Sequence, residues 1–563
     1  MSLLDIRDLR VSIGGAAILK SLSLTLAGGE ILGLVGESGS GKSLTALSVM
    51  GLLPPQASRT GSVRLAGAEL TTKSETELCA LRGREMGMIF QEPMSALNPL
   101  LSIGQQVAET VRVHRRASRQ EAEQIARHTL DRVGLPAERF PLGLYPHELS
   151  GGQRQRVAIA IAIALTPRLL IADEPTTALD VTTQAQILAL LQRLVREDGI
   201  GLVLVTHDLA VVAQVADRVA VMKDGEIVEQ GRIGKLFHSP RHPFLSTLLH
   251  DAAHRPVRMP HPDAAASPIL EVEGVVRDYP PSGRSHRRGG EAFRAVDGVS
   301  LFIRPGENVG LVGESGCGKS TLLRTILGLE AAQAGDIRVY GVSLGRAQGA
   351  ALRQLRRQIQ VVFQDPWGSF DPRWRVERVV GESFHLLEVA PAARQRRRQV
   401  EEVLERVGLS PSDADRYPHE FSGGQRQRIA IARALITEPS ILVLDEAVSA
   451  LDVSIRAQIL DLLAGLSQGL SCLFVSHDLA VVQAITDRVY IMHDGRIVES
   501  GATEAVFNSP QHPYTAGLAA AAPNLARALR QREEQAARDE PVPARLLASG
   551  TLFRVKRRVQ GII

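Results

Sequence analysis

Two short glycine-rich segments contain the residue types that bind phosphate groups. They read GESGSGKS at residues 36–43 and GESGCGKS at residues 313–320, and each follows an apolar, strand-like run. Glycines let backbone N–H groups approach phosphate oxygens, a lysine reaches the β and γ oxygens, and a hydroxyl can bind magnesium. We therefore expect two phosphate-binding loops. Their expected ligand-contacting residues are Gly36, Ser38, Gly39, Gly41, Lys42, Ser43 and Leu44, and Gly313, Ser315, Gly316, Gly318, Lys319, Ser320 and Thr321.

An acidic pair ends each of two further apolar runs. The pairs are Asp173 with Glu174 and Asp445 with Glu446, each after four apolar residues. Such a run predicts a buried strand whose carboxyl end lies near the nucleotide. The aspartate suits Mg²⁺, and the glutamate suits the polarisation of water. Phosphoryl transfer to water needs a positioned nucleophile and stabilised charge on the γ-phosphoryl group, so we expect Glu174 and Glu446 to polarise the attacking water.

The chain repeats the same short motifs in the same order. After each glycine-rich loop come FQEP or FQDP, then LSGGQRQR or FSGGQRQR, then the acidic pair, then VTHD or VSHD. The two copies of each motif are separated by about 270–280 positions throughout. A nearly constant offset indicates a duplicated domain.

Together these motifs resemble those of the ABC ATPase family, and the resemblance covers nearly the whole chain twice. It implies an α/β fold with two tandem ABC-type P-loop NTPase domains, each with a RecA-like mixed-sheet core and an α-helical subdomain. It also implies that the domains face each other head to tail, so that the LSGGQ-type signature of one closes on ATP held by the other. The D-loops, which end at Asp180 and Asp452, are intact.

The resemblance assigns further residues to two composite sites. One site combines Lys42, Glu174 and His207 with the second signature, and the other combines Lys319, Glu446 and His477 with the first. The signature residues expected to bind ATP are Ser150, Gly151, Gly152 and Gln153, and Ser422, Gly423, Gly424 and Gln425. The expected magnesium ligands are Ser43, Gln91 and Asp173, and Ser320, Gln364 and Asp445.

The two halves depart from the family pattern in different places. Tyr279 occupies the place of the aromatic residue that stacks on adenine, whereas the first half has Ile13 there. We expect adenine stacking in the first half to be weaker or achieved by other means. Ala447 replaces the proline that follows the glutamate in the first copy, which should alter loop stiffness and not chemistry.

A second repeated motif suggests the branch of the family. It reads SPRHPF at residues 239–244 and SPQHPYT at residues 509–515, and it resembles the C-terminal extension of peptide and nickel importer ATPases. We expect a first domain at 1–251, a Pro-rich linker at 252–268, a second domain at 269–508, and the HPYT extension with a charged tail at 509–563. Residues 280–290 are expected to form a surface insertion. The charged residues 524–540 have helical spacing and are expected to form a solvated tail.

Composition argues against a membrane-spanning chain, an iron–sulfur protein and a nucleic-acid-binding protein. The longest apolar run, residues 157–165, is far shorter than the roughly 18 residues that cross a membrane, and the N-terminus lacks the features of a signal peptide. Only Cys79, Cys317 and Cys472 are present, so we expect no iron–sulfur cluster. A net charge of +4 is mild for 563 residues, and no nucleic-acid partner is expected.

The resemblance implies an ATP hydrolase coupled to transport, the motor of an importer of dipeptides or oligopeptides. Two transmembrane permease subunits and an extracytoplasmic solute-binding protein would be its partners, which places the chain peripherally on the cytoplasmic face of the inner membrane. Nickel or other metal chelates, glutathione and oligosaccharide-like solutes stay open as cargo. The alternative from another class is a soluble ribosome-associated ABC-F-like ATPase, which would have a long charged linker in place of the short Pro-rich one.

Overall fold

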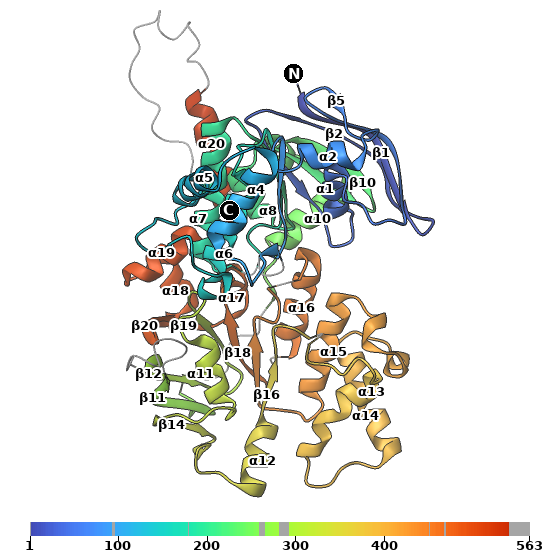
Figure 1. Cartoon of the computed structure of the whole chain (residues 1–563). Coiled ribbons are helices and arrows are strands. Elements are labelled where there is room, and N and C mark those ends of the chain that lie inside the picture. The colour runs from blue at the N-terminus through green and yellow to red at the C-terminus, as the bar shows by residue number, and fades with distance from the viewer. Residues whose placement is uncertain are drawn as a thin grey trace, which may run out of the picture.

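The computed structural model of the chain has two halves of similar build, drawn one above the other in Figure 1. It describes residues 2–92, 96–177, 179–257, 265–280, 292–366, 368–449, 451–466 and 469–539. Residues 281–290 of the expected insertion, 258–264 of the expected linker and 540–563 of the expected tail lie outside these ranges. We call residues 2–257 the first half and residues 265–539 the second half.

The first half is built on one mixed sheet of ten strands in the order β5-β4-β1-β2-β10-β9-β3-β8-β7-β6. Strands β6, β7, β8, β3 and β9 pair in parallel, whereas β1, β2, β4 and β5 pair antiparallel. The strands are β1 (Ser2–Ile13), β2 (Ala16–Ala27), β3 (Ile31–Val35), β4 (Ala57–Leu65), β5 (Ala68–Glu69), β6 (Met86–Ile89), β7 (Leu169–Asp173), β8 (Gly201–Val205), β9 (Arg218–Lys223) and β10 (Glu226–Arg232).

The second half repeats this topology in two sheets. Their orders are β12-β11-β14-β15 and β16-β17-β18-β13-β19-β20, which correspond to β2-β1-β4-β5 and β6-β7-β8-β3-β9-β10 of the first half. The duplication expected from the sequence is therefore present in the strand order. The strands are β11 (Leu270–Tyr279), β12 (Phe293–Ile303), β13 (Asn308–Val312), β14 (Ala334–Val339), β15 (Val342–Ser343), β16 (Ile359–Val362), β17 (Ile441–Asp445), β18 (Ser471–Ser476), β19 (Arg488–His493) and β20 (Arg496–Ala502).

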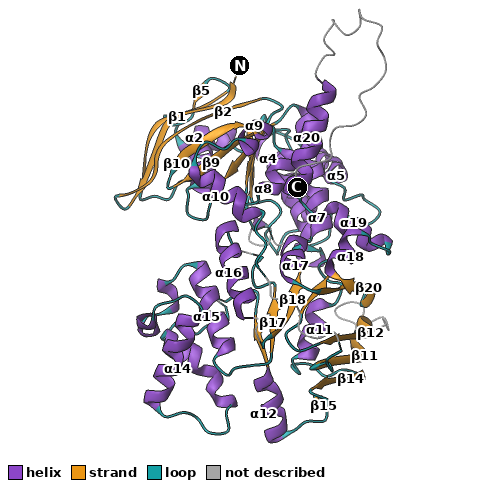
Figure 2. Cartoon of the chain, turned by 180° about the vertical axis from the view of Figure 1, so that it is seen from behind, coloured by secondary structure: helices purple, strands orange, loops and turns teal. Residues whose placement is uncertain are grey.

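Helices cover the sheets and form a helical subdomain in each half (Figure 2). In the first half they are α1 (Lys42–Met50), α2 (Glu75–Leu81), α4 (Ile103–His114), α5 (Arg119–Arg132), α6 (Gly151–Ile163), α7 (Val181–Asp198), α8 (Leu209–Val215), α9 (Ile233–His238) and α10 (Pro243–Ala252). In the second half they are α11 (Lys319–Ile326), α12 (Gly349–Gln358), α13 (Val376–Val380), α14 (Ala393–Arg406), α15 (Gly423–Leu435), α16 (Val453–Leu466), α17 (Leu479–Ile485), α18 (Thr503–Asn508), α19 (Pro513–Ala521) and α20 (Leu525–Asp539). No helix in the described ranges is both long enough and apolar enough to span a bilayer.

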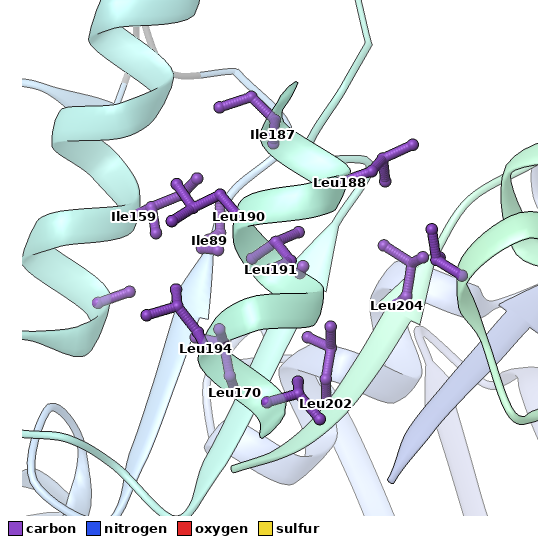
Figure 3. Close-up of a cluster of buried hydrophobic side chains, with 14 of the residues drawn as sticks. Ile89, Ile159, Leu170, Ile187, Leu188, Leu190, Leu191, Leu194, Leu202 and Leu204 are labelled. Carbon is purple, nitrogen blue, oxygen red and sulfur yellow. The ribbon is translucent and has the colours of Figure 1, made fainter. Parts of the chain in front are cut away.

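The apolar face of α7 shows how the core holds the sheet in place. Its buried residues Ile187, Leu190, Leu191 and Leu194 recur at helical spacing and pack on strands β7 and β8 and on helix α6 (Figure 3). Burying one such side chain contributes about 1.5–3 kcal/mol. Strand β7 ends in the first acidic pair, so this packing fixes the point from which that pair extends.

The C-terminal helix α20 packs against the first half, which lies far from it in sequence (Figure 1). Leu525, Ala528 and Leu529 join the core cluster of the first half, and Arg532 donates hydrogen bonds to the backbone oxygens of Ala213 and Ala216. Carbonyls at a helix end have no partner within their own helix, so they accept these bonds readily. The expectation of a solvated tail at residues 524–540 is therefore wrong: a narrow apolar strip among the charges is enough to dock the helix.

Shortening this strip should loosen the first half. We expect Leu525→Ala with Leu529→Ala to lower the free energy of unfolding by about 1–3 kcal/mol, because both side chains lose apolar contacts with that core. Amide hydrogen exchange in α8 should become faster while exchange in α15 stays unchanged. Leu329→Ala is the matched control, since Leu329 is 59% exposed. Unchanged exchange in α8 would show that the contact does not stabilise the first half.

Candidate functional site

Both phosphate-binding loops join a buried parallel strand to a helix, as their sequence predicts. We call residues 36–43 the first P-loop and residues 313–320 the second P-loop. Gly41 and Gly318 precede α1 and α11 with φ of 98° and 107°, in the left-handed region that favours glycine. A Cβ on Gly318 would lie 2.2 Å from the backbone oxygen of Ala295. Only glycine therefore fits at this turn into the helix.

The lysine of each P-loop is buried and held by the loop itself. Lys42 Nζ donates to the backbone oxygens of Gly36 and Glu37 at 2.8 and 2.9 Å. Lys319 Nζ donates to those of Gly313 and Glu314 at 2.7 and 2.8 Å. Burial lowers the pKa of Lys42. A buried cation whose nearest partners are neutral carbonyls is suited to an incoming anion such as phosphate.

The two glutamates of the acidic pairs meet the two histidines. His207 Nδ1 lies 3.1 Å from Glu174 Oε1, and His477 Nδ1 lies 3.0 Å from Glu446 Oε1. Both glutamates have a φ of 47°, which is uncommon for a residue with a side chain. This left-handed turn follows directly after strands β7 and β17. The structure thus brings each predicted glutamate to its predicted histidine.

Charge in these sites is set by burial and by the histidines. Burial alone would raise the pKa of Glu174, but the hydrogen bond and charge of His207 lower it to about 2. The pKa of Glu446 is also lowered against the effect of burial by His477. Burial, and then the charge of Glu446, raise the pKa of Asp445 to about 6. Each glutamate is therefore ionised at neutral pH, as an acceptor of a proton must be.

Two of the expected magnesium ligands of the first site contact each other. Ser43 Oγ donates to Asp173 Oδ1 at 3.2 Å, and burial raises the pKa of Asp173. Hydroxyl and carboxylate oxygens are the donors that Mg²⁺ prefers, so the residues present fit the ion. Gln91 contacts the glutamate of the same acidic pair: its Nε2 donates to Glu174 Oε2 at 2.9 Å. Its amide is bound to the glutamate in this state, and its role as a ligand stays a prediction.

The signature segments cap helices of their own half. Ser150 and Ser422 accept hydrogen bonds from the backbone N–H groups of Gln153 and Gln425, at the first turns of α6 and α15. Their contacts with nucleotide in the opposite half stay a prediction.

The D-loops make the hydrogen bonds that cross between the halves near the P-loops. Ser38 donates from its backbone N and from its Oγ to Asp452 Oδ1, both at 2.9 Å. Thr182, two residues after Asp180, donates from Oγ1 to Glu314 Oε1 at 2.6 Å. Each P-loop is thus held by the D-loop region of the other half, as a head-to-tail pair requires.

Sequence reasoning left three of these contact residues out of the site. Asp452 was recognised only as the end of an intact D-loop, Thr182 follows the other D-loop, and Tyr514 belongs to the HPYT motif that served only to indicate the branch of the family. Tyr514 Oη accepts a hydrogen bond from the backbone N–H of Glu314 at 2.9 Å. The D-loop and the HP motif each occur twice, once after each copy of the acidic pair. This repetition was the signal that could have identified these residues.

Tyr279 ends β11 and is engaged within its own half. Its hydroxyl donates to Glu330 Oε2 at 2.5 Å, and the guanidinium of Arg277 lies 4.9 Å from its ring centre. One ring face is therefore covered by a cation. Stacking of adenine on the other face stays a prediction.

Family models and known relatives match most of this chain. Residues 19–177 and 296–449 match the family model described as ABC transporter, and residues 498–558 match the one described as oligopeptide/dipeptide transporter, C-terminal region. The chain is 45% identical to a glutathione import ATP-binding protein GsiA of Salmonella choleraesuis over 94% of this chain and 90% of the relative. The GsiA of Escherichia coli K12 is 44% identical over 95% and 91%.

Among solved structures, the dimeric ATP-binding cassette MJ0796 bound to ADP and Pi matches with 29% identity. The match covers 42% of this chain and 98% of the cassette, with a TM-score of 0.38. Two matched segments in one polypeptide, and relatives similar over nearly their whole length, establish the family. The chain belongs to the ABC transporter family, as an ATP-binding protein with two fused ATPase domains.

Proposed function

We propose that this chain hydrolyses ATP at two sites and thereby drives the import of short peptides, including peptides of the glutathione type. The observation that supports it best is the pairing of an ionised glutamate with a histidine at both sites, so that neither half lacks the groups for hydrolysis. The match of the C-terminal region to oligopeptide and dipeptide transporters supports the peptide class. Relatives named for glutathione import support the same class, because glutathione is a short peptide.

In this proposal the P-loop would bind the phosphates of ATP, and the acidic pair would serve hydrolysis. Lys42 and the backbone N–H groups of the first P-loop would bind the phosphates of ATP, and Glu174 would accept a proton from the attacking water. His207 would hold the carboxylate in place, and the proton that Glu174 accepted would pass to the departing phosphate. Lys319, Glu446 and His477 would act likewise at the second site. Ser43 with Asp173, or Ser320 with Asp445, would hold Mg²⁺, which would supply charge that stabilises the phosphoryl oxygens.

We also propose the partners of the chain, its location in the cell and the limits of its domains. Two permease subunits and an extracytoplasmic binding protein would supply the pore and the cargo site, and the chain would lie on the cytoplasmic face of the membrane. The first domain would span 1–251 and the second 269–508, joined by 252–268 and followed by 509–563. The three cysteines are far apart in sequence, and Cys317 and Cys472 are buried, so no iron–sulfur cluster is proposed.

Uptake of labelled solutes tests the proposal. Cells that contain the permeases and either the native chain or the Glu174→Gln, Glu446→Gln variant would receive labelled glutathione and a labelled dipeptide separately. We expect uptake of at least one to depend on the native glutamates, and unlabelled short peptides to compete with it. If the purified native chain hydrolyses ATP but the variant imports both solutes normally, the peptide assignment fails.

A further inference from the structure

An HP motif lies near the end of each half, and that of the second half reaches back to the P-loop of the same half. His242 and His512 cap helices α10 and α19 in the same way, each accepting the backbone N–H two residues later at 3.2 Å. The aromatic residue at that second position differs: Phe244 in the first half and Tyr514 in the second. The aromatic rings at this position of the two halves therefore differ by one hydroxyl group.

The Tyr514 hydroxyl is placed by the fold. Its ring stacks on His493, with centroids 4.0 Å apart and an interplanar angle of 25°. His493 ends β19, which pairs in parallel with β13, the strand that leads into the second P-loop. Burial raises the pKa of Tyr514, which keeps its hydroxyl protonated at neutral pH. In the first half Lys223 occupies the place of His493, and its Nζ lies 4.9 Å from the ring centre of Phe244.

Glu314 contacts the HPYT motif, the buried lysine of its own P-loop and the first half. Its backbone N–H donates to Tyr514 Oη at 2.9 Å, and its backbone oxygen accepts from Lys319 Nζ at 2.8 Å. Its carboxylate accepts from Thr182 of the first half at 2.6 Å. The N–H of Glu314 shares a peptide group with the carbonyl of Gly313, which accepts from Lys319 Nζ at 2.7 Å. A peptide group held at both its N–H and its carbonyl cannot rotate freely, so the Tyr514 bond fixes the Gly313 carbonyl that orients the buried lysine.

The same tyrosine lies where the two halves meet. Helix α19 packs on α7, the helix after the first D-loop, and Tyr514 packs against a buried cluster that contains Val181 of α7 and Val312 at the end of β13. Movement of the first D-loop relative to the second half would thus act on Tyr514 and on Glu314 together. In the first P-loop the crossing contact is made instead by Ser38 with Asp452.

We propose that Tyr514 is a positioning residue of the second ATP site, which holds the peptide group between Gly313 and Glu314 and couples that P-loop to the first D-loop, so that the two ATP sites are unequal. This inference rests on the proposed ATPase function. Phe244 gives the first site no such hydroxyl. The second P-loop is accordingly the more firmly preorganised of the two for phosphate.

Site-resolved binding of a photoreactive ATP analogue to the full chain tests this inference. The parent protein has Glu174→Gln and Glu446→Gln so that nucleotide is not consumed, and labelled peptides from each half are quantified separately after digestion. We expect Tyr514→Phe to raise the analogue concentration for half-maximal labelling of the second half about two- to tenfold, the usual effect of one lost hydrogen bond. Labelling of the first half should not change.

Tyr490→Phe is the matched control. Its hydroxyl also accepts a backbone N–H, that of Phe302 at 3.1 Å, in the same half but outside the P-loop. An equal shift at both halves, no shift, or the same shift in Tyr490→Phe would overturn the inference. If the parent protein labels neither half, the proposed ATPase function fails instead.

Discussion

Replacing both Glu174 and Glu446 by glutamine is expected to lower the rate of ATP hydrolysis by about 10²–10⁴-fold, the usual contribution of a positioned acid or base. The reason is the loss of an ionised oxygen beside each histidine, where the pKa of Glu174 is held at about 2. Glutamine has nearly the same shape, so the left-handed turn after each strand should persist. Steady-state phosphate release at saturating ATP measures the effect, and ATP binding should be retained.

The single variants separate the two sites. If the two sites act independently, each single variant should retain some ATP hydrolysis, whereas the double variant should not. Glu405→Gln is the control for the loss of a charge, because Glu405 is exposed on α14. Turnover within threefold of native in the double variant would mean that another group activates water, and the assignment of the glutamates would be wrong.

Replacing Lys42 and Lys319 by alanine should weaken ATP binding itself. Each lysine is 6% exposed and donates to loop carbonyls at the distances given above, so its charge is available to a phosphate in a water-poor site. Loss of one buried charged partner typically costs about 2–5 kcal/mol. We therefore expect the Kd for ATP to rise about 30-fold or more at each altered site, measured by equilibrium binding.

Lys20→Ala serves as the control, since Lys20 is an exposed lysine of the same half. Its Kd should equal that of the native chain. If Lys42→Ala and Lys319→Ala bind ATP with native affinity, the two glycine-rich loops are not the nucleotide sites, and the argument from their geometry fails.

The parts of the site that the sequence predicted are those encoded by local patterns. Glycines at positions with positive φ, such as Gly41, and apolar runs that end in an acid, such as the one before Asp173, specify a turn and a buried strand wherever the chain places them. The meeting of His207 with Glu174 follows because β7 and β8 are neighbours in one sheet. The duplicated order of motifs then predicted the duplicated order of strands.

The contacts between the halves could not be predicted in this way. They depend on how two separately folded sheets face each other, and no local spacing encodes that placement. Asp452 reaches Ser38, and Thr182 reaches Glu314, across the two halves. The docking of α20 was missed because its many charges outnumber Leu525, Ala528 and Leu529, which carry the contact. Tyr514 differs from Phe244 by one hydroxyl group. The sequence does not show which group this hydroxyl contacts, whereas the structure does.

The most direct test of the account is the amount of ATP retained by the Glu174→Gln, Glu446→Gln variant. The full chain would be incubated with labelled ATP and Mg²⁺, separated from free nucleotide by gel filtration, and assayed for nucleotide per chain. The account predicts two ATP molecules per chain, and loss of both when Ser150 and Ser422 are also replaced by bulky residues that block the signature segments. Retention of a single ATP, or of two that survive the blocked signatures, would contradict the claim that each half completes the site of the other.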